Sequence, residues 1–155
     1  MLAAAEDALS DTLAQVLALA QGGGHDPHLA EFVRRFYSHA APQDLDHYGP
    51  EALFGIAAAV WKISAERAGG KRVVAAAPAP QPITGETLIV ALNDDKPFLY
   101  DSTMAELNAQ GLRVKAAFHP IIHVRRDGQW RRIALSAPPE GGEAFRESYI
   151  CVTIE

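Results

Sequence analysis

The chain has little of what secreted or membrane-spanning proteins require. Its 155 residues include a single cysteine, Cys151, so no internal disulfide can form and nothing indicates an oxidising compartment. No uninterrupted apolar run approaches the roughly 20 residues that a membrane helix needs. The first 20 residues carry three acidic residues and no basic residue, unlike a secretory signal. These features predict a cytoplasmic protein without a membrane partner.

The broad basic surface expected of a nucleic-acid-binding protein is also missing. The net charge is −5, and up to Gly70 there are nine Asp or Glu against four Lys or Arg, whereas the remainder has ten of each. RNA-recognition domains further require several stacking aromatic residues in one strand, and residues 149–154 supply only one. We therefore expect no nucleic-acid partner.

Motifs that bind dinucleotides or phosphate are absent. No G-x-G-x-x-G turn joins a strand to a helix, and the glycines at 22–24 lie between two predicted helices, where a flexible connector is expected. Gly70-Lys71 resembles the end of a P-loop, but Ala65 stands at the first glycine position and Arg72 at the Ser/Thr position. The sequence predicts no bound cofactor in this chain.

The histidines and serines do not form a recognisable metal or nucleophile motif either. His119 and His123 would lie about 13 Å apart in a strand, too far to share one ion. His25 and His28 flank a helix start, where a solvated loop is expected, and no cysteine pair completes a zinc site. Ser102 lacks the glycine pattern of a nucleophile elbow. We predict no catalytic residue and no metal ligand.

Residues 1–70 predict a helical unit of three helices, separated by the glycines at 22–24 and by a break over residues 42–49. Asp26 and Pro27 indicate the cap and first turn of the second helix. Pro50 begins the third, which should end at Gly69-Gly70. Apolar stripes of this kind face the core, at Leu9, Leu13, Val16, Leu17, Ala20, Leu29, Phe32, Val33, Phe36, Leu53, Ile56, Ala57, Val60, Trp61 and Ser64.

A short strand and a proline-rich linker, together residues 71–82, should connect this unit to a second domain at 83–155. The second domain begins with a buried-type strand (87–92) and a helix. A strand (114–119) interrupted at Pro120, a hairpin (121–135) and a last strand (149–154) follow. This order is most of the ferredoxin-like β-α-β-β-α-β plan. The predicted fold class is α+β, a helical unit followed by an incomplete ferredoxin-like β-α-β-β domain with an antiparallel hairpin.

The junction after strand 87–92 is crowded with acidic residues. Asp95 is predicted to cap the following helix, with Pro97 in its first turn and Gly111 in the left-handed conformation that closes it.

The exact residues of this region indicate more than its pattern of strand, loop and helix does. It resembles the N-terminal region of the large bacterial NAD-specific glutamate dehydrogenases, from about Thr87 to Glu155 and more loosely before. In that family the region is similar to an ACT-type regulatory domain. The resemblance rests on Asn93-Asp94-Asp95-x-Pro97-Phe98-Leu99-x-Asp101-Ser102, Glu106-Leu107-Asn108-x-x-Gly111-Leu112, His119-Pro120, Val124-Arg125-Arg126-Asp127 and Glu147-Ser148.

The resemblance implies a function for the parent protein and a different one for this chain. The parent would oxidatively deaminate L-glutamate to 2-oxoglutarate with NAD, releasing ammonia and NADH. This chain would be its non-catalytic regulatory or assembly region, with NAD bound elsewhere in the parent. The expected partners are the remaining domains, further copies of the chain in a homo-oligomer, and an amino-acid effector. The alternative is a free-standing ACT-like module that senses an amino acid.

The resemblance also indicates one candidate site. In ACT domains the first strand-to-helix loop contributes to amino-acid binding, and free N–H groups at a helix start suit a carboxylate. Phe98 stands where ligand-binding ACT domains commonly carry glycine, and two acidic residues would repel a carboxylate. We therefore favour helix capping and inter-domain contact over ligand binding. The candidate residues are Asn93, Asp94, Asp95, Pro97, Phe98 and Leu99.

Two further expectations concern the sheet. In a ferredoxin-like plan the strand 87–92 would lie between the third strand and a fourth that is not encoded here, so one apolar edge would be open. We expect residues 72–77 or a second copy of the chain to cover it. Arg125, Arg126, Arg131 and Arg132 are expected to form a charged, solvated hairpin.

Overall fold

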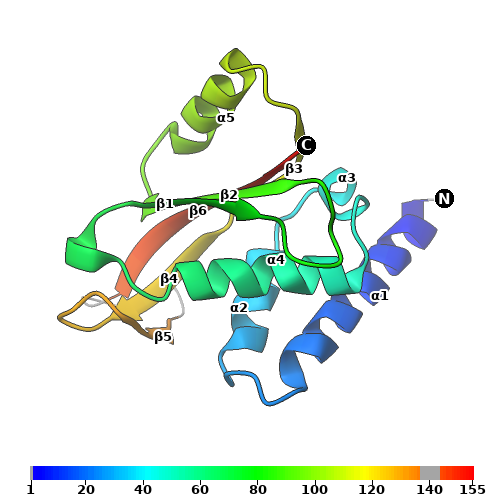
Figure 1. The fold of residues 1–155 in the computed structure, drawn as a ribbon. Coiled ribbons are helices and arrows are strands. Elements are labelled where there is room, and N and C mark those ends of the chain that lie inside the picture. Colours follow the sequence, from blue (N-terminus) through cyan, green and yellow to red (C-terminus); the bar gives the residue numbers. More distant parts are fainter. Residues whose placement is uncertain (1, 137–143) are drawn as a thin grey trace.

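The computed structural model describes residues 2–136 and 144–155, which form a mixed α+β fold (Figure 1). Helices α1, α2 and α4 cover one face of an antiparallel sheet, and α5 lies on the other face. The helices are α1 (Leu2–Gln21), α2 (Leu29–Phe36), α3 (Pro42–Leu45), α4 (Pro50–Ile63), the 3-10 turn η1 (Ala68–Gly70) and α5 (Leu99–Ala109). The strands are β1 (Val73–Pro78), β2 (Thr87–Asp94), β3 (Val114–Phe118), β4 (Ile121–Arg126), β5 (Arg132–Leu135) and β6 (Ala144–Ile154).

The helical unit follows the apolar pattern closely. All four stripe residues of α2 are buried, and Pro50 occupies the first turn of α4 as predicted. Helix α2 begins at Leu29, after a turn in which the Asp26 carboxylate accepts the N–H of His28 at 2.8 Å. Helix α4 ends at Ile63, earlier than predicted. The Leu9 side chain lies outside the described part of the chain.

Strand β6 is the centre of the sheet. It pairs with β2 along one edge and with both β3 and β4 along the other. Strands β3 and β4 therefore act as one strand broken at Pro120, whose carbonyl accepts the N–H of Tyr149 at 3.0 Å. The predicted interruption at Pro120 is confirmed. Its cause is that proline has no N–H to donate to the ladder.

The open edge of β2 is covered by β1, as one of the two sequence-based expectations required. The pairing is antiparallel and runs from Val73 opposite Leu92 to Pro78 opposite Thr87. Strand β1 thus occupies the position that a fourth strand would take in a ferredoxin-like sheet. A segment that precedes the β-α-β-β unit completes its sheet.

The hairpin between β4 and β5 has a longer turn than the Asp127-Gly128 dipeptide indicated. Strand β5 begins only at Arg132, and the left-handed position is taken by Trp130 (φ 64). The Asp127 carboxylate accepts the backbone N–H groups of Gln129 and Arg131, at 2.8 and 3.0 Å. These bonds hold the turn without a glycine at that position.

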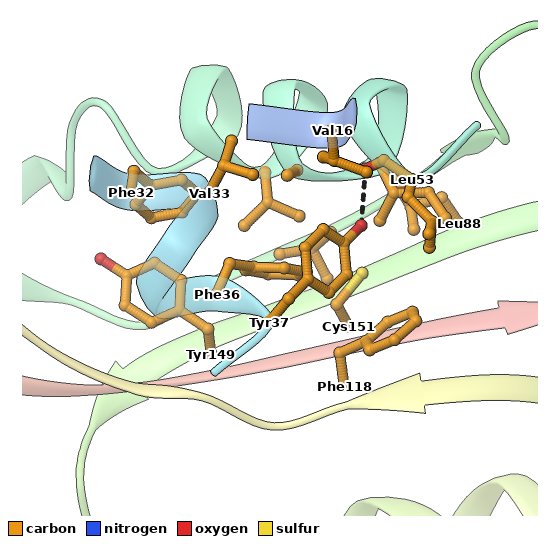
Figure 2. Packing of buried hydrophobic residues seen from close by; sticks show 14 of the residues in the cluster. Val16, Phe32, Val33, Phe36, Tyr37, Leu53, Leu88, Phe118, Tyr149 and Cys151 are labelled. Carbon is orange, nitrogen blue, oxygen red and sulfur yellow. Dashed lines mark hydrogen bonds between the residues drawn. The ribbon is translucent and has the colours of Figure 1, made fainter. Parts of the chain in front are cut away.

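The main core lies between the helices and the sheet (Figure 2). Phe36 and Tyr37 meet Phe118 at ring-centroid distances of 5.9 and 5.3 Å. The Tyr37 hydroxyl donates to the Leu53 carbonyl at 2.5 Å, and Cys151 is fully buried beside them. The division at residues 70 and 83 stays a prediction, but the two parts share this continuous core.

A smaller core lies under α5. Leu107, Ile150, Val152 and Ile154 are its buried members, and Ile89 and Ala91 of β2 pack against it. Both faces of β2 are therefore apolar and covered, as its uncharged sequence indicated.

The start of α5 differs from the prediction. The helix begins at Leu99, so Pro97 precedes it, and Asp95 does not cap it. Asp95 instead forms an ion pair with Arg146 of β6, at 2.8 Å, and its N–H donates to the Arg146 carbonyl. Gly111 (φ 73) closes the helix as predicted.

Candidate functional site

The predicted loop leads from the end of β2 into α5, and its acidic residues are engaged within the chain. Asp94 pairs with the guanidinium of Arg67 at 3.0 Å, and Asp95 pairs with Arg146. The Asn93 side-chain oxygen accepts the N–H of Asp94 at 2.8 Å. The two acids therefore fix the loop to the fold through ion pairs and not by capping α5, and the inter-domain contact expected of the loop stays a prediction.

The apolar residues of the loop point to different environments. Phe98 is 76% exposed and adopts φ 67, a left-handed conformation that favours glycine. This backbone geometry gives a physical reason for the glycine that ligand-binding ACT domains commonly carry there. Pro97 is exposed, whereas Leu99 packs against the smaller core.

The six candidate residues do not converge on one cavity. Asn93 and Asp94 line an open hollow of about 500 Å³, together with Gly70, Lys71, Arg72 and Lys96. Pro97, Phe98 and Leu99 do not line it.

Behind the loop lies a buried ionic cluster that the sequence reading missed. The Glu147 carboxylate is fully buried and binds two guanidinium groups, Arg67 at 2.6 Å and Arg126 at 2.9 Å through each of its oxygens. The side chains of both arginines are 0% exposed. The Tyr149 hydroxyl donates to the same carboxylate at 3.0 Å. This cluster joins the segment after α4 to strands β4 and β6, and Arg67 extends it to Asp94.

The prediction of a solvated arginine hairpin is therefore wrong for Arg126. Strand β4 alternates, and Arg126 shares the buried face with Ile122 and Val124. That two-residue period was the signal in the sequence. Arg131 is exposed, as predicted, and pairs with Asp127 at 3.2 Å.

Arg132 also departs from the solvated interpretation. Its guanidinium carbon lies 3.3 Å from the centroid of a Trp61 ring, and it donates to the Ser64 hydroxyl at 2.8 Å and to the Trp61 carbonyl at 3.0 Å. Burial lowers the pKa of Arg132 to about 10. The nearby positive charge of Arg126 also lowers this pKa.

His119 is held between α5 and β6 by a ring contact and a hydrogen bond. Its ring stacks on Tyr100 at 5.0 Å with an interplanar angle of 7°, and its Nε2 lies 2.8 Å from the Ser148 hydroxyl. Burial lowers the pKa of His119.

Among residues 2–136 and 144–155, no group of three or more potential ligands could hold a metal ion, and no helix is long and apolar enough to cross a bilayer.

Comparison with known proteins places the chain in a family. The family model described as "Glutamate dehydrogenase, ACT1 domain" matches residues 32–155. An NAD-specific glutamate dehydrogenase from Halomonas elongata is 36% identical over 70 residues, which cover 44% of this chain and 4% of that protein. No solved structure matches. The matched residues include β2, α5 and the complete ionic cluster. Because the match spans most of the chain, the chain belongs to the glutamate dehydrogenase ACT1 domain family.

Proposed function

We propose that this chain is the non-catalytic N-terminal regulatory or assembly region of an NAD-specific glutamate dehydrogenase. The parent would convert L-glutamate and NAD into 2-oxoglutarate, ammonia and NADH in the cytoplasm. The observation that carries the proposal is the ACT1 match over residues 32–155. The similarity to an NAD-specific glutamate dehydrogenase, of which the aligned segment is only 4%, supports chemistry and NAD binding outside this region.

The loop geometry supports a role in contact rather than in chemistry. Asp94 and Asp95 are held by Arg67 and Arg146, so the loop has a fixed shape. Phe98, which is largely exposed, lies on this loop directly before α5. A large exposed aromatic side chain on a fixed loop suits a protein contact, since aromatic residues are enriched at interfaces. We assign the loop to contact with a remaining domain of the parent or with a second copy of the chain.

The alternative is a free-standing ACT-like module that senses an amino acid. The two functions predict different sizes for the native protein. An antibody against this chain should detect a protein far larger than 16.7 kDa in cell extract if the chain is a region of the dehydrogenase. A native species of about that mass, shown by intact-mass analysis not to be a proteolytic product, would favour the module.

The non-catalytic role is tested separately with the purified chain. We expect no reduction of NAD with L-glutamate and no NAD binding by calorimetry. Turnover that survives stringent purification, and that is lost on substitution of a residue of this chain, would overturn the proposal.

A further inference from the structure

Strand β1 covers the edge of β2 but leaves an edge of its own open. It is the last strand on its side of the sheet, and in the described part of the chain it pairs with β2 alone. Its outer side therefore carries backbone N–H and C=O groups that no neighbouring strand satisfies. Such a row of groups is a template for pairing with another chain. The Val74 side chain on this strand is 67% exposed.

The pairing with β2 determines which backbone groups point outward. Ala79 donates its N–H to the Glu86 carbonyl at 2.9 Å, so these two residues form a hydrogen-bonded pair, and every second residue before Ala79 also faces β2. The residues in between, Val74, Ala76 and Pro78, direct their backbone groups away from the sheet. Within residues 2–136 and 144–155, no turn, loop or side chain accepts the N–H of Val74 or of Ala76.

Two other edge strands are protected against pairing, whereas β1 is not. On β3, the Asp44 carboxylate of α3 accepts the backbone N–H of Ala117 at 3.1 Å. Strand β5 is four residues long, begins with Arg132 and pairs with β4 through an irregular register. Charges, bulges and short length are common devices against edge pairing. Strand β1 has six residues and no charge, and it ends at Pro78, which has no N–H.

The open edge is complementary to a second copy of itself. When two β1 strands run antiparallel about a two-fold axis at Ala75, Val74 lies opposite Ala76 of the second copy. These two residues exchange both backbone hydrogen bonds, and the symmetry repeats the pair. At each end, Arg72 donates its N–H to the carbonyl of Pro78 of the second copy. The ladder stops there, because Pro78 has no N–H to return.

Side-chain size and charge also fit this arrangement. Ala75 faces its own symmetry copy in a non-hydrogen-bonded pair, where Cα atoms approach to about 4.5 Å and small side chains fit. The two copies of Arg72 are about six residues apart along the ladder, roughly 20 Å, so their charges do not oppose the contact. The exposed Val74 lies directly beside Ala76 of the second copy on the same face of the sheet.

We propose that two copies of this chain pair antiparallel through β1, in the register centred on Ala75, and so join their six-stranded sheets into one. A contact of this symmetry uses the same surface on both copies and closes after two. The pairing gives the assembly role of the proposed function a defined surface, and it rests on that function for this role alone. Its test measures association and uses neither NAD nor L-glutamate, so failure of one proposal is distinguishable from failure of the other.

Sedimentation velocity of the 155-residue chain tests the pairing. We expect the mass to approach twice 16.7 kDa as the concentration rises to about 200 µM, because a contact made by one strand is small. Ala76→Pro should prevent dimerisation, because it removes an outward N–H from each copy and leaves the ladder to β2 intact. Val74→Lys, which leaves the backbone unchanged, should weaken dimerisation by about tenfold or more, because it places two like charges near the axis.

Ile133→Lys is the matched control, since Ile133 is 59% exposed on the other edge strand, β5. This variant should dimerise as the wild type does, and circular dichroism checks that all three variants are folded. A wild-type chain that stays monomeric, or a dimer that both β1 variants leave intact, would overturn the proposal.

A disulfide tests the register. Ala75→Cys should form an intermolecular disulfide under mild oxidation, because a Cα separation of about 4.5 Å lies within the range of disulfides. Ala77→Cys, on the same face of β1, should not, because its two copies are about four residues apart along the ladder, roughly 13 Å. The native Cys151 is fully buried, so the wild-type chain should not cross-link. Equal cross-linking at positions 75 and 77 would contradict the register.

Hydrogen exchange distinguishes a second copy from another domain of the parent. The amides of Val74 and Ala76 should exchange slowly in the concentrated chain and rapidly after dilution. Rapid exchange of the separate chain at every concentration, with protection only in the parent, would place another domain on this edge. That result would overturn the self-pairing and leave the proposed function intact.

Discussion

Replacing Glu147 by glutamine should destabilise the fold strongly, because this carboxylate neutralises two buried guanidinium groups. Removing one partner of a buried ion pair typically costs about 3–5 kcal/mol, since the other charge stays buried. Two features place the change near the lower limit. Glutamine keeps the shape and one acceptor oxygen, and Asp94, whose side chain is 53% exposed, remains on Arg67. We therefore expect a loss of about 3 kcal/mol, a large fraction of the ~5–15 kcal/mol typical of a domain.

Urea unfolding followed by tryptophan fluorescence measures this loss. Trp130 is a suitable reporter, because the Arg67 guanidinium carbon lies 5.8 Å from the centroid of its ring. Glu155→Gln is the control, since it removes the same charge from the exposed pair with Arg113 and should leave the midpoint unchanged. A loss in Glu147→Gln of less than about 1 kcal/mol would show that the cluster does not depend on this carboxylate.

Three further predictions test the loop, the core and the pH response. Phe98→Gly should raise the free energy of unfolding by about 0.5–1 kcal/mol, because glycine removes the left-handed strain at little loss of contact; a decrease in urea midpoint would contradict this. The Cys151 thiol is fully buried, and burial raises its pKa, so a thiol reagent should label it only in denaturant; rapid labelling of the native protein would show that the core is open. Because burial lowers the pKa of His119, the unfolded chain takes up the proton first, and stability should fall as the pH drops below about 6.5; His119→Gln should lose less between pH 7 and pH 5, and an equal loss would exclude His119 as the cause.

The elements with regular apolar spacing could be predicted from the sequence. The stripe Leu29, Phe32, Val33 and Phe36 is buried in α2, and the uncharged run in β2 is covered on both faces. The pairing of β1 with β2 followed from a physical requirement, the covering of an open apolar edge, rather than from the residues of β1. Apolar spacing is visible within one short segment, and an open apolar strand edge must be covered in any fold. Both features could therefore be predicted from a single sequence.

The polar interactions could not be predicted in the same way, because they join residues far apart in the sequence. Asp95 is a residue type that often caps helices, but its side chain forms an ion pair with Arg146, on a strand about 50 residues later. Arg67 and Glu147 are separated by 80 residues, and nothing local marks them as partners. Arg126 is the exception, since its position in the alternation of β4 already placed it on the buried face. The role of the loop 93–99 as a site stays a prediction, and the contacts of its acidic residues become visible only in the three-dimensional fold.

A non-catalytic role of this region is tested by glutamate-dependent NADH formation in the parent protein, measured with and without residues 1–155. We expect that the shortened parent still produces NADH, with altered assembly or regulation, and that the separate chain produces none. Loss of NADH formation from a correctly folded shortened parent would contradict a non-catalytic role if single substitutions within this chain also abolish NADH formation by the full parent.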